Sequence, residues 1–305
     1  MPRALGRDIE EIFGFAPDDL SENARSVWES TNCPFVGRPC IKYNHNRTIC
    51  YGTCSVSSRT KSGNETVIVC PNRLYADRYK VLRSVAEDAF GREFPFYTYS
   101  EYVNNPLNIE SCVVILGHNS GREIKLGASL SMDWIVARVE NGRLVEYVGV
   151  EVQSIDISGN YRDTWQAYKE LPENPNISIP TSAHGLNWAN VHKRLIPQLI
   201  RKGLVYSRSS LVKRGLYFIL PDRVYHEFEK VLGTLNAPET IDNTTMTVFT
   251  YDLGEPVASG FHRDLRHIRS LRFSLSDFSS QFIAGSNLSN ASELDSLIRD
   301  TLDRR

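Results

Sequence analysis

The segment from Asp133 to Gln153 constrains the fold of this chain most, because it combines two apolar runs, a turn and acidic residues. Asp133 opens the run Asp-Trp-Ile-Val-Ala-Arg-Val, Asn141-Gly142 follows, and a second run from Val148 reads Val-Gly-Val-Glu-Val-Gln. Asn-Gly between apolar runs is a strong signal for a β-hairpin. The pattern therefore predicts a hairpin that brings acidic groups together on a sheet.

The register of this hairpin decides whether the acidic groups meet. Side chains alternate along a strand, so Gly149, Glu151 and Gln153 share one face and the intervening valines share the core face. A two-residue turn would set Asp133 opposite Val150, on the wrong face, whereas a three-residue loop would set it opposite Gly149. We therefore expect the longer turn, or a bulge or bend near Asp133.

Converging carboxylates of this kind suit a hard divalent cation such as Mg²⁺, which prefers oxygen ligands. Asp133 and Glu151 would hold the ion, which activates water in phosphodiester cleavage. Gln153 cannot act as a general base and would orient water or bind metal through its carbonyl. Glu123 could supply a further carboxylate from the preceding element. The alternative is an exposed strand whose polar side chains face water, because short motifs often arise by chance.

A basic segment follows the acidic one. No Asp or Glu occurs between Glu173 and Asp222, although the net charge of the whole chain is only −1. Such a segment could follow a phosphate backbone, and the alternative is a solvated helix surface. Its basic residues are Lys193, Arg194, Arg201, Lys202, Arg208, Lys213 and Arg214.

Candidate DNA-reading side chains stand at the start of a predicted helix over residues 187–204. Asn suits adenine edges and Arg suits guanine edges, whereas Lys more often contacts phosphate. Asn187 could equally cap the helix. The candidates in this helix are Asn187, Asn190, Lys193 and Arg194, and Tyr161 and Arg162, just after the acidic strand, could contact the backbone near the cut.

Five of the six cysteines lie within a short N-terminal segment. In a reducing compartment, clustered cysteines are more often metal ligands than disulfides, and four thiolates suit zinc or iron. We take Cys33, Cys40, Cys54 and Cys70 as the ligands, with Cys50 in excess. Free thiols without a metal are the alternative. Cys112 lies in an apolar run and is expected in the core.

The order of elements indicates an α/β (mixed α+β) fold with a central mixed sheet flanked by helices, because strands and helices do not alternate regularly. Residues 9–30 suggest short helical pieces, and 31–73 suggest a loop region with one strand at 66–69. We divide the chain into 1–92 (cysteine module and helix), 93–278 (core and DNA-binding helix) and 279–305 (a tail with a weak helix). Without a spanning or signal segment, we expect a cytoplasmic protein.

Three ordered blocks resemble the NotI-type type II restriction endonucleases of the PD-(D/E)xK superfamily. The first is the cysteine block that ends in Cys70-Pro-Asn-Arg73. The second runs from Met132-Asp-Trp through Gly149-Val-Glu-Val-Gln to Gly159-Asn-Tyr-Arg162. The third is Gly185-Leu-Asn-Trp-Ala-Asn-Val-His-Lys-Arg194. The similarity covers roughly residues 31 to 205.

The resemblance implies a PD-(D/E)xK nuclease core and a Mg²⁺-dependent endonuclease that cuts GC-rich palindromic double-stranded DNA as a homodimer. It implies Asp133, Glu151 and Gln153 as catalytic residues, with Glu123 as the upstream glutamate. It also implies a prokaryotic host with a cognate DNA methyltransferase. The cysteines would hold one structural iron, with zinc as the alternative.

Two points stay open after this resemblance. Spacing from Cys40 favours Cys50 as the third thiolate, whereas spacing back from Cys70 favours Cys54, which we choose. The activity has two alternatives. One is a repair or resolvase-type nuclease that reads DNA shape, and the other is a non-catalytic metal-containing DNA-binding protein.

Overall fold

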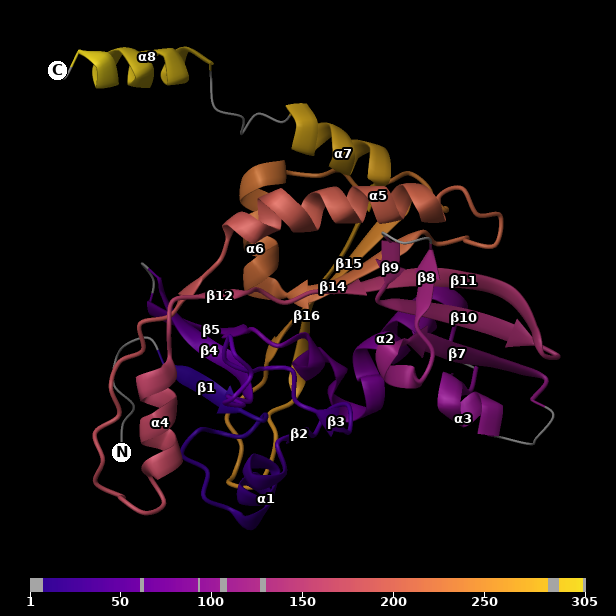
Figure 1. Ribbon diagram of the computed structural model, residues 1–305. Helices are drawn as coiled ribbons and strands as arrows, with labels where there is room; N and C mark the ends of the chain where they lie inside the picture. Colours follow the sequence, from indigo (N-terminus) through magenta and orange to yellow (C-terminus); the bar gives the residue numbers. More distant parts are fainter. Residues whose placement is uncertain are drawn as a thin grey trace.

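A seven-stranded mixed sheet forms the centre of the computed structural model (Figure 1), which describes residues 8–60, 63–92, 94–104, 109–126, 130–284 and 291–303. Its strand order is β16-β15-β14-β11-β10-β7-β6. The strands β11, β14 and β15 run parallel, whereas β10 is antiparallel to both β7 and β11. The strands are β6 (Phe96–Thr98), β7 (Ser111–Gly117), β10 (Trp134–Glu140), β11 (Arg143–Val152), β14 (Leu216–Pro221), β15 (Thr245–Leu253) and β16 (Leu265–Ser274).

Helices cover both faces of this sheet, as Figure 1 shows. The apolar side of α2 (Ala76–Phe90) packs on the face that carries the alternate valines of β11. On the other face lie α5 (Ile196–Tyr206), α6 (Asp222–Leu232) and α7 (Leu275–Ala284). The predicted central mixed sheet flanked by helices is therefore confirmed, and both faces of β11 are buried.

A smaller sheet, in the order β1-β4-β5, holds the N-terminal part of the chain. Its strands are β1 (Ile9–Ile12), β4 (Thr53–Thr60) and β5 (Gly63–Ile68). The helix α4 (Arg162–Glu170) follows β11 in the chain but contributes Trp165 and Tyr168 to the core around β1. The segment after the acidic strand therefore ties the central sheet to the N-terminal part.

Shorter elements complete the described chain. The 3₁₀ turn η1 (Pro71–Tyr75) precedes α2, and the π-helical turn η3 (Val191–Leu195) leads directly into α5, which has Pro197 in its first turn. The helix predicted over residues 187–204 therefore contains a π-helical turn just before Pro197. The others are α1 (Glu22–Ser30), β2 (Asn32–Cys33), β3 (Arg38–Pro39), α3 (Tyr99–Asn104), η2 (His118–Ser120), β8 (Ile124–Leu126), β9 (Leu130–Met132), β12 (Ile157–Ser158), β13 (Gly185–Leu186) and α8 (Ala291–Leu302).

The N-terminal region corrects two sequence expectations. Residues 9–12 form β1 rather than helix, and residues 53–60 form β4 within the stretch expected to be loop. The inward positions of β4 include Ser55 and Ser57, which hydrogen-bond to Glu11 and Asp8 respectively. Buried small polar residues hide the apolar alternation that identifies a strand.

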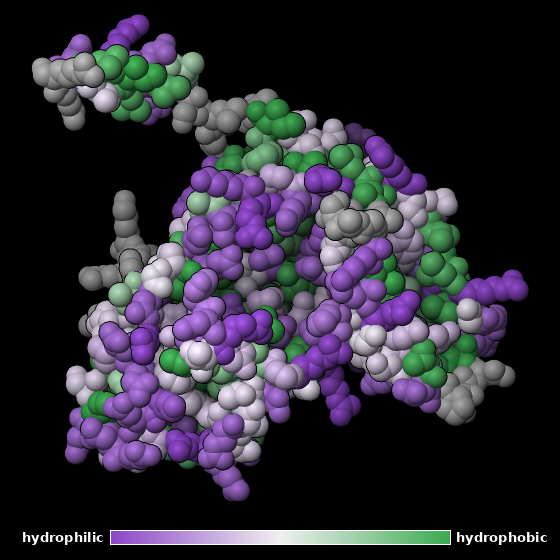
Figure 2. All heavy atoms as spheres, viewed as in Figure 1, coloured by the Kyte–Doolittle hydropathy of each residue, from purple (hydrophilic) through white to green (hydrophobic). Residues whose placement is uncertain are grey.

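The C-terminal helix α8 stands apart from the body of the molecule. None of its described residues is buried, and its apolar side chains are visible in Figure 2. They lie at helical spacing: Leu294, Leu297, Ile298 and Leu302. Nowhere in the described chain is a helix long and apolar enough to cross a lipid bilayer.

Candidate active site

A bulged hairpin sets the acidic residues of β10 and β11 against each other. The turn has two residues, Asn141 and Gly142, both with positive φ, and it pairs Glu140 with Arg143. Beyond it the register shifts by one residue at Val145, so the expected longer turn is absent and a bulge takes its place.

The shift restores the face that the acidic residues need to share. Trp134 now pairs with Val150 and Ile135 with Gly149, so continuing the register brings Asp133 level with Glu151. The chain also bends at Asp133. The predicted bend is therefore present at Asp133, whereas the bulge lies at Val145, next to the turn.

The carboxylate of Asp133 is fixed at the end of the strand pair. Its Oδ2 accepts a hydrogen bond of 3.1 Å from the backbone N–H of Val152, which continues the hairpin ladder through a side chain. The side chain of Asp133 is 39% exposed, whereas that of Glu151 is 7% exposed. One carboxylate of the pair thus faces solvent and the other is enclosed.

Lys202 is a site residue that the sequence analysis placed in the basic surface segment. Its Nζ donates to Oε2 of Glu151 and lies 4.0 Å from Oδ1 of Asp133, and its side chain is 11% exposed. A signal was available, because Leu199 and Tyr206 of α5 are buried and Lys202 falls on the same helical stripe. A lysine within an apolar stripe indicates an inward ammonium.

Burial and a neighbouring negative charge raise the pKa of Glu151. Burial, with a smaller contribution from the negative charge of Asp133, raises the pKa of Glu151 to about 8 against the lowering effect of Lys202. Its Oε1 accepts no hydrogen bond from any described residue. A buried carboxylate oxygen without a donor is costly in an apolar setting, so this oxygen is available to a ligand.

Gly149 makes room for Tyr206 beside this carboxylate pair. A Cβ at position 149 would overlap the ring of Tyr206. The hydroxyl of Tyr206 is buried without a hydrogen-bond partner among the described residues, and burial followed by the charge of Glu151 raises its pKa. The aromatic ring closes the site on the side of α5.

The remaining predicted site residues lie at the edges of the pair. The amide of Gln153 donates to the carbonyl of Ser154 at 3.1 Å. Glu123 precedes Ile124, which pairs with Met132 in the β8–β9 ribbon, and within the described residues its carboxylate does not form a three-carboxylate cluster with Asp133 and Glu151. The carboxylate of Glu123 accepts from Ser131 at 2.6 Å, and this bond lowers its pKa.

The donors of this site fit Mg²⁺ in kind. Asp133 and Glu151 offer hard oxygens, one of them without a donor, and Mg²⁺ is commonly held by one or two carboxylates together with water. Within the described ranges, no three His, Cys, Asp or Glu side chains form a ready-made metal site. Metal binding at this centre would therefore rest on the two carboxylates.

The cysteine segment gathers thiols in the N-terminal part. All six cysteines are free, and those chosen as ligands (Cys33, Cys40, Cys54 and Cys70) are buried. Hydrogen bonding with Cys54 lowers the pKa of Cys70 to about 7, and hydrogen bonding with Cys40 lowers that of Cys50 to about 7. Four thiols therefore form two hydrogen-bonded pairs, and Cys33 lies close enough to feel the charge of Cys70. The choice between Cys50 and Cys54 stays a prediction.

Backbone donors around the thiols suit a thiolate site. The backbone of Phe35 lowers the pKa of Cys33 against the larger effect of burial, and that of Asn72 does the same for Cys70. The N–H of Lys42 lies 3.4 Å from the sulfur of Cys40. Such donors stabilise negative sulfur, so this chemistry fits a soft metal, although the thiols do not converge as a ready-made site.

Two candidate DNA-reading residues meet the edge of the acidic centre. Asn190 and Arg194 line a cavity of about 220 Å³ together with Gln153. The amide of Asn190 donates to Asp156 at 2.8 Å. The start of the basic helix therefore opens toward the strand that carries Glu151.

The other candidates are distributed around this cavity. Lys193 and Arg162 are exposed, and Asn187 is half-buried. The backbone N–H of Asn187 donates to the carbonyl of Asp156, and the N-cap position of η3 is Asn190, which makes no side-chain cap hydrogen bond. The ring of Tyr161 is half-buried and packs edge-on against Tyr51, with ring centroids 5.1 Å apart.

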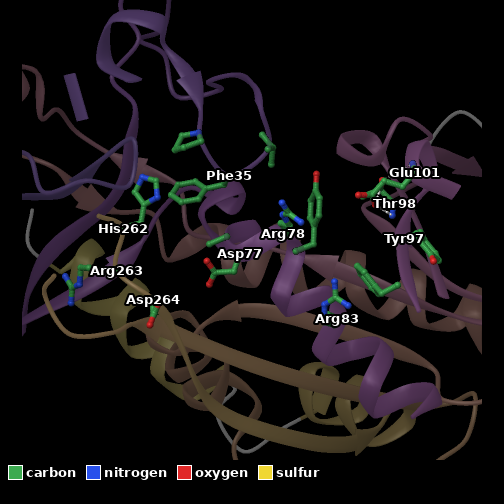
Figure 3. Close-up of a pocket in the computed structure, with 15 residues that line it drawn as sticks. Phe35, Asp77, Arg78, Arg83, Tyr97, Thr98, Glu101, His262, Arg263 and Asp264 are labelled. Atoms are coloured by element: carbon green, nitrogen blue, oxygen red, sulfur yellow. Dashed lines mark hydrogen bonds between the residues drawn. The ribbon is translucent and has the colours of Figure 1, made fainter. Parts of the chain in front are cut away.

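A further hollow lies between the Cys33 loop, α2 and α3. Its cavity volume is about 780 Å³, and Figure 3 shows charged side chains of both signs around it. Because the charges balance, this lining indicates neither an anion nor a cation as ligand. The charged residues are Arg78, Arg83, Arg263, Asp77, Glu101 and Asp264.

Comparison with known proteins adds one match. The model of a protein family described as "Restriction endonuclease NotI" matches residues 18–262. This span contains the cysteine segment, the bulged hairpin and the whole of α5. No curated protein matches the chain.

Proposed function

Because this chain belongs to the NotI restriction endonuclease family, we propose that it is a Mg²⁺-dependent type II restriction endonuclease that cuts double-stranded DNA. The observation that carries the metal requirement is the pair of Asp133 and Glu151, in which Glu151 is enclosed and one of its buried oxygens lacks a donor. The family membership supports a site-specific DNA endonuclease, and we extend it to a palindromic, GC-rich target.

The proposed reaction is hydrolysis of a phosphodiester. Water gives up a proton to solvent as its oxygen bonds to phosphorus, the bond from phosphorus to the leaving oxygen breaks, and the leaving oxygen takes up a proton from solvent. Bound Mg²⁺ would supply a Lewis acid that polarises the phosphate and the attacking water. Asp133 and Glu151 would hold it, Gln153 would orient water, and Glu123 would act from the outer edge.

The order of elements supports a PD-(D/E)xK core. In chain order α2, β7, β10, β11, α5 and β14 give a helix, three antiparallel strands, a helix and a strand parallel to β11. The acidic pair lies where β10 begins and β11 ends. We assign these elements to the nuclease core.

Target recognition would begin at the start of the basic helix. Asn190 and Arg194 share a cavity with Gln153, so a base edge read there would lie close to the proposed cutting centre. Lys193 and Arg162 are exposed and suit phosphate contacts. Asn187 and Tyr161 complete the proposed DNA-contacting set.

The remaining assignments rest on the family resemblance. We propose that the chain acts as a homodimer, because a palindromic target matches a two-fold symmetric protein. A cognate methyltransferase would protect the host DNA. Cys33, Cys40, Cys54 and Cys70 would hold one structural iron, or zinc, near the DNA-binding surface.

Digestion of a supercoiled plasmid with Mg²⁺ tests the function. We expect discrete fragments whose sequenced ends share one short palindrome. Asp133→Asn should slow cutting by at least about 100-fold and keep DNA binding, because it removes a ligand charge and preserves shape. Lys80→Met, an exposed change on α2, should cut normally.

Other outcomes would identify the alternatives. Cutting confined to branched or damaged DNA would indicate a nuclease that reads shape. Binding without any cutting, unaffected by Asp133→Asn, would indicate a DNA-binding protein in which the acidic pair has no role.

A further inference from the structure

The ammonium of Lys202 is buried at a place where the fold does not require a charge. Its neighbours on the inward stripe of α5 are Leu199 and Tyr206. Removing an ammonium from water costs several kcal/mol, and apolar residues of similar size are often as stable as a buried ion pair. The position would therefore suit a methionine or leucine if packing were its only task.

The positive charge of Lys202 forms ion pairs only with the carboxylates of Asp133 and Glu151 within the described chain. Lys202 bonds Glu151 and lies 4.0 Å from Asp133. Across the described chain, no other basic side chain makes an ion pair with either carboxylate. Gln153, on the same face of β11, carries no charge.

Counting charges shows what Lys202 adds. Two ionised carboxylates and a divalent cation sum to zero, so they leave the single negative charge of a phosphodiester unbalanced. With the ammonium the centre has one positive charge, which matches the bound phosphate, and further negative charge develops as water attacks. The amide of Gln153 cannot supply this balance.

We propose that Lys202 is the cationic catalytic residue of this centre. In the metal-free protein it is held between Glu151 and Asp133, and during turnover its ammonium contacts a non-bridging oxygen of the scissile phosphate. The four-carbon stem allows such a shift of the head group without movement of α5. This inference rests on the proposed nuclease function.

The test compares Lys202→Met, which keeps length and removes charge, with Lys202→Arg and the exposed control Lys80→Met. The first measurement is calorimetric titration of metal-free protein with MgCl₂ in the absence of DNA. We expect Lys202→Met to bind Mg²⁺ roughly tenfold more tightly, because no ammonium competes for the carboxylates. Lys80→Met should titrate like the wild type.

The second measurement is single-turnover cleavage at saturating Mg²⁺, with DNA affinity measured separately in Ca²⁺. We expect Lys202→Met to cleave at least about 100-fold more slowly with DNA affinity unchanged, because stabilisation of the reacting phosphate is lost. Cleavage at the wild-type rate would overturn the proposal, whatever the metal affinity.

Lys202→Gln and Lys202→Arg cover the case in which Lys202→Met does not fold. Lys202→Arg should retain measurable cleavage and exceed Lys202→Gln, and equal rates for the two would overturn the proposal. If the wild type itself cut no duplex DNA, the nuclease function would fail. The MgCl₂ titration would then decide whether Lys202 competes with Mg²⁺ for the two carboxylates. An unchanged Mg²⁺ affinity in Lys202→Gln would refute this competition as well.

Discussion

At the scale of single residues, Gly149 shows how closely the site is packed. A side chain at this position would meet the ring of Tyr206. We expect Gly149→Ala to lower the free energy of unfolding by about 1–3 kcal/mol, the usual cost of overpacking a core. Urea denaturation would measure it.

A second substitution tests the cause of that loss. Tyr206→Leu introduced into Gly149→Ala should recover part of the stability, because the smaller side chain frees the space above β11. If the double variant were less stable than the sum of the two single effects, overlap with Tyr206 would not explain the loss.

The raised pKa of Glu151 predicts a pH-dependent metal affinity. Below pH 8 the metal-free site keeps a proton on Glu151, which has a pKa of about 8, and metal binding must release it. Apparent Mg²⁺ affinity should therefore rise by about tenfold per pH unit up to roughly pH 8 and then level off. Calorimetry at several pH values would show this, and a flat profile would contradict it.

The raised pKa of Glu151 also makes the stability of the metal-free protein depend on pH. A carboxyl whose folded pKa exceeds its unfolded pKa of about 4.3 favours folding when protonated. Glu151 therefore contributes stability to the metal-free protein at low pH, and this contribution is lost as pH rises from about 4 through 8.

At the scale of elements, a buried ion pair joins β1 to η1. Arg73 and Glu11 are both fully buried, with Nε and Oε2 3.0 Å apart. We expect Arg73→Ala to cost about 3–5 kcal/mol of unfolding free energy, because it strands the charge of Glu11. Chemical denaturation would give this value.

An exposed pair provides the matched control. Arg92 lies 3.7 Å from Glu87 on the surface, where ion pairs contribute little. Arg92→Ala should therefore change stability by less than about 1 kcal/mol. Similar losses in the two variants would mean that burial is not what makes the Arg73 pair important.

The cysteine segment gives another prediction at this scale. If Cys54 is the third ligand, Cys54→Ser should lose bound iron or zinc. It should also destabilise the protein, because metal binding at this site is coupled to folding. Cys50→Ser should keep the metal. Metal content by mass spectrometry and thermal unfolding would show the difference. Metal loss in Cys50→Ser alone would assign the site to Cys50.

Sequence predictability differed between elements for physical reasons. The alternation in β11 correctly placed Val150 in the core and Glu151 on the opposite face, because burial leaves a period of two. It could not locate the bulge at Val145, since a bulge changes pairing without changing composition. The structure alone identified Lys202 as a site residue, because its charge had suggested a surface position.

At the scale of the whole molecule, the proposed dimer predicts that the two DNA strands are cut by different subunits and can therefore be cut independently. In a homodimer with one centre per strand, each Asp133 serves a single strand. Mixing equal amounts of wild type and Asp133→Asn under exchange conditions should give about half heterodimers. These should nick supercoiled plasmid, because one strand meets an active centre and the other does not.

The proportions of open-circular and linear plasmid on an agarose gel test whether each subunit cuts one strand. Open circles should accumulate in the mixture and should be rare with wild type alone, where both strands are cut. A mixture of separately prepared proteins that has not exchanged subunits is the control. Labelled subunits would verify that exchange has taken place. If the exchanged mixture still gave linear product at half the rate without open circles, the cutting of each strand would not depend on its own centre. The two-fold arrangement would then have to be abandoned.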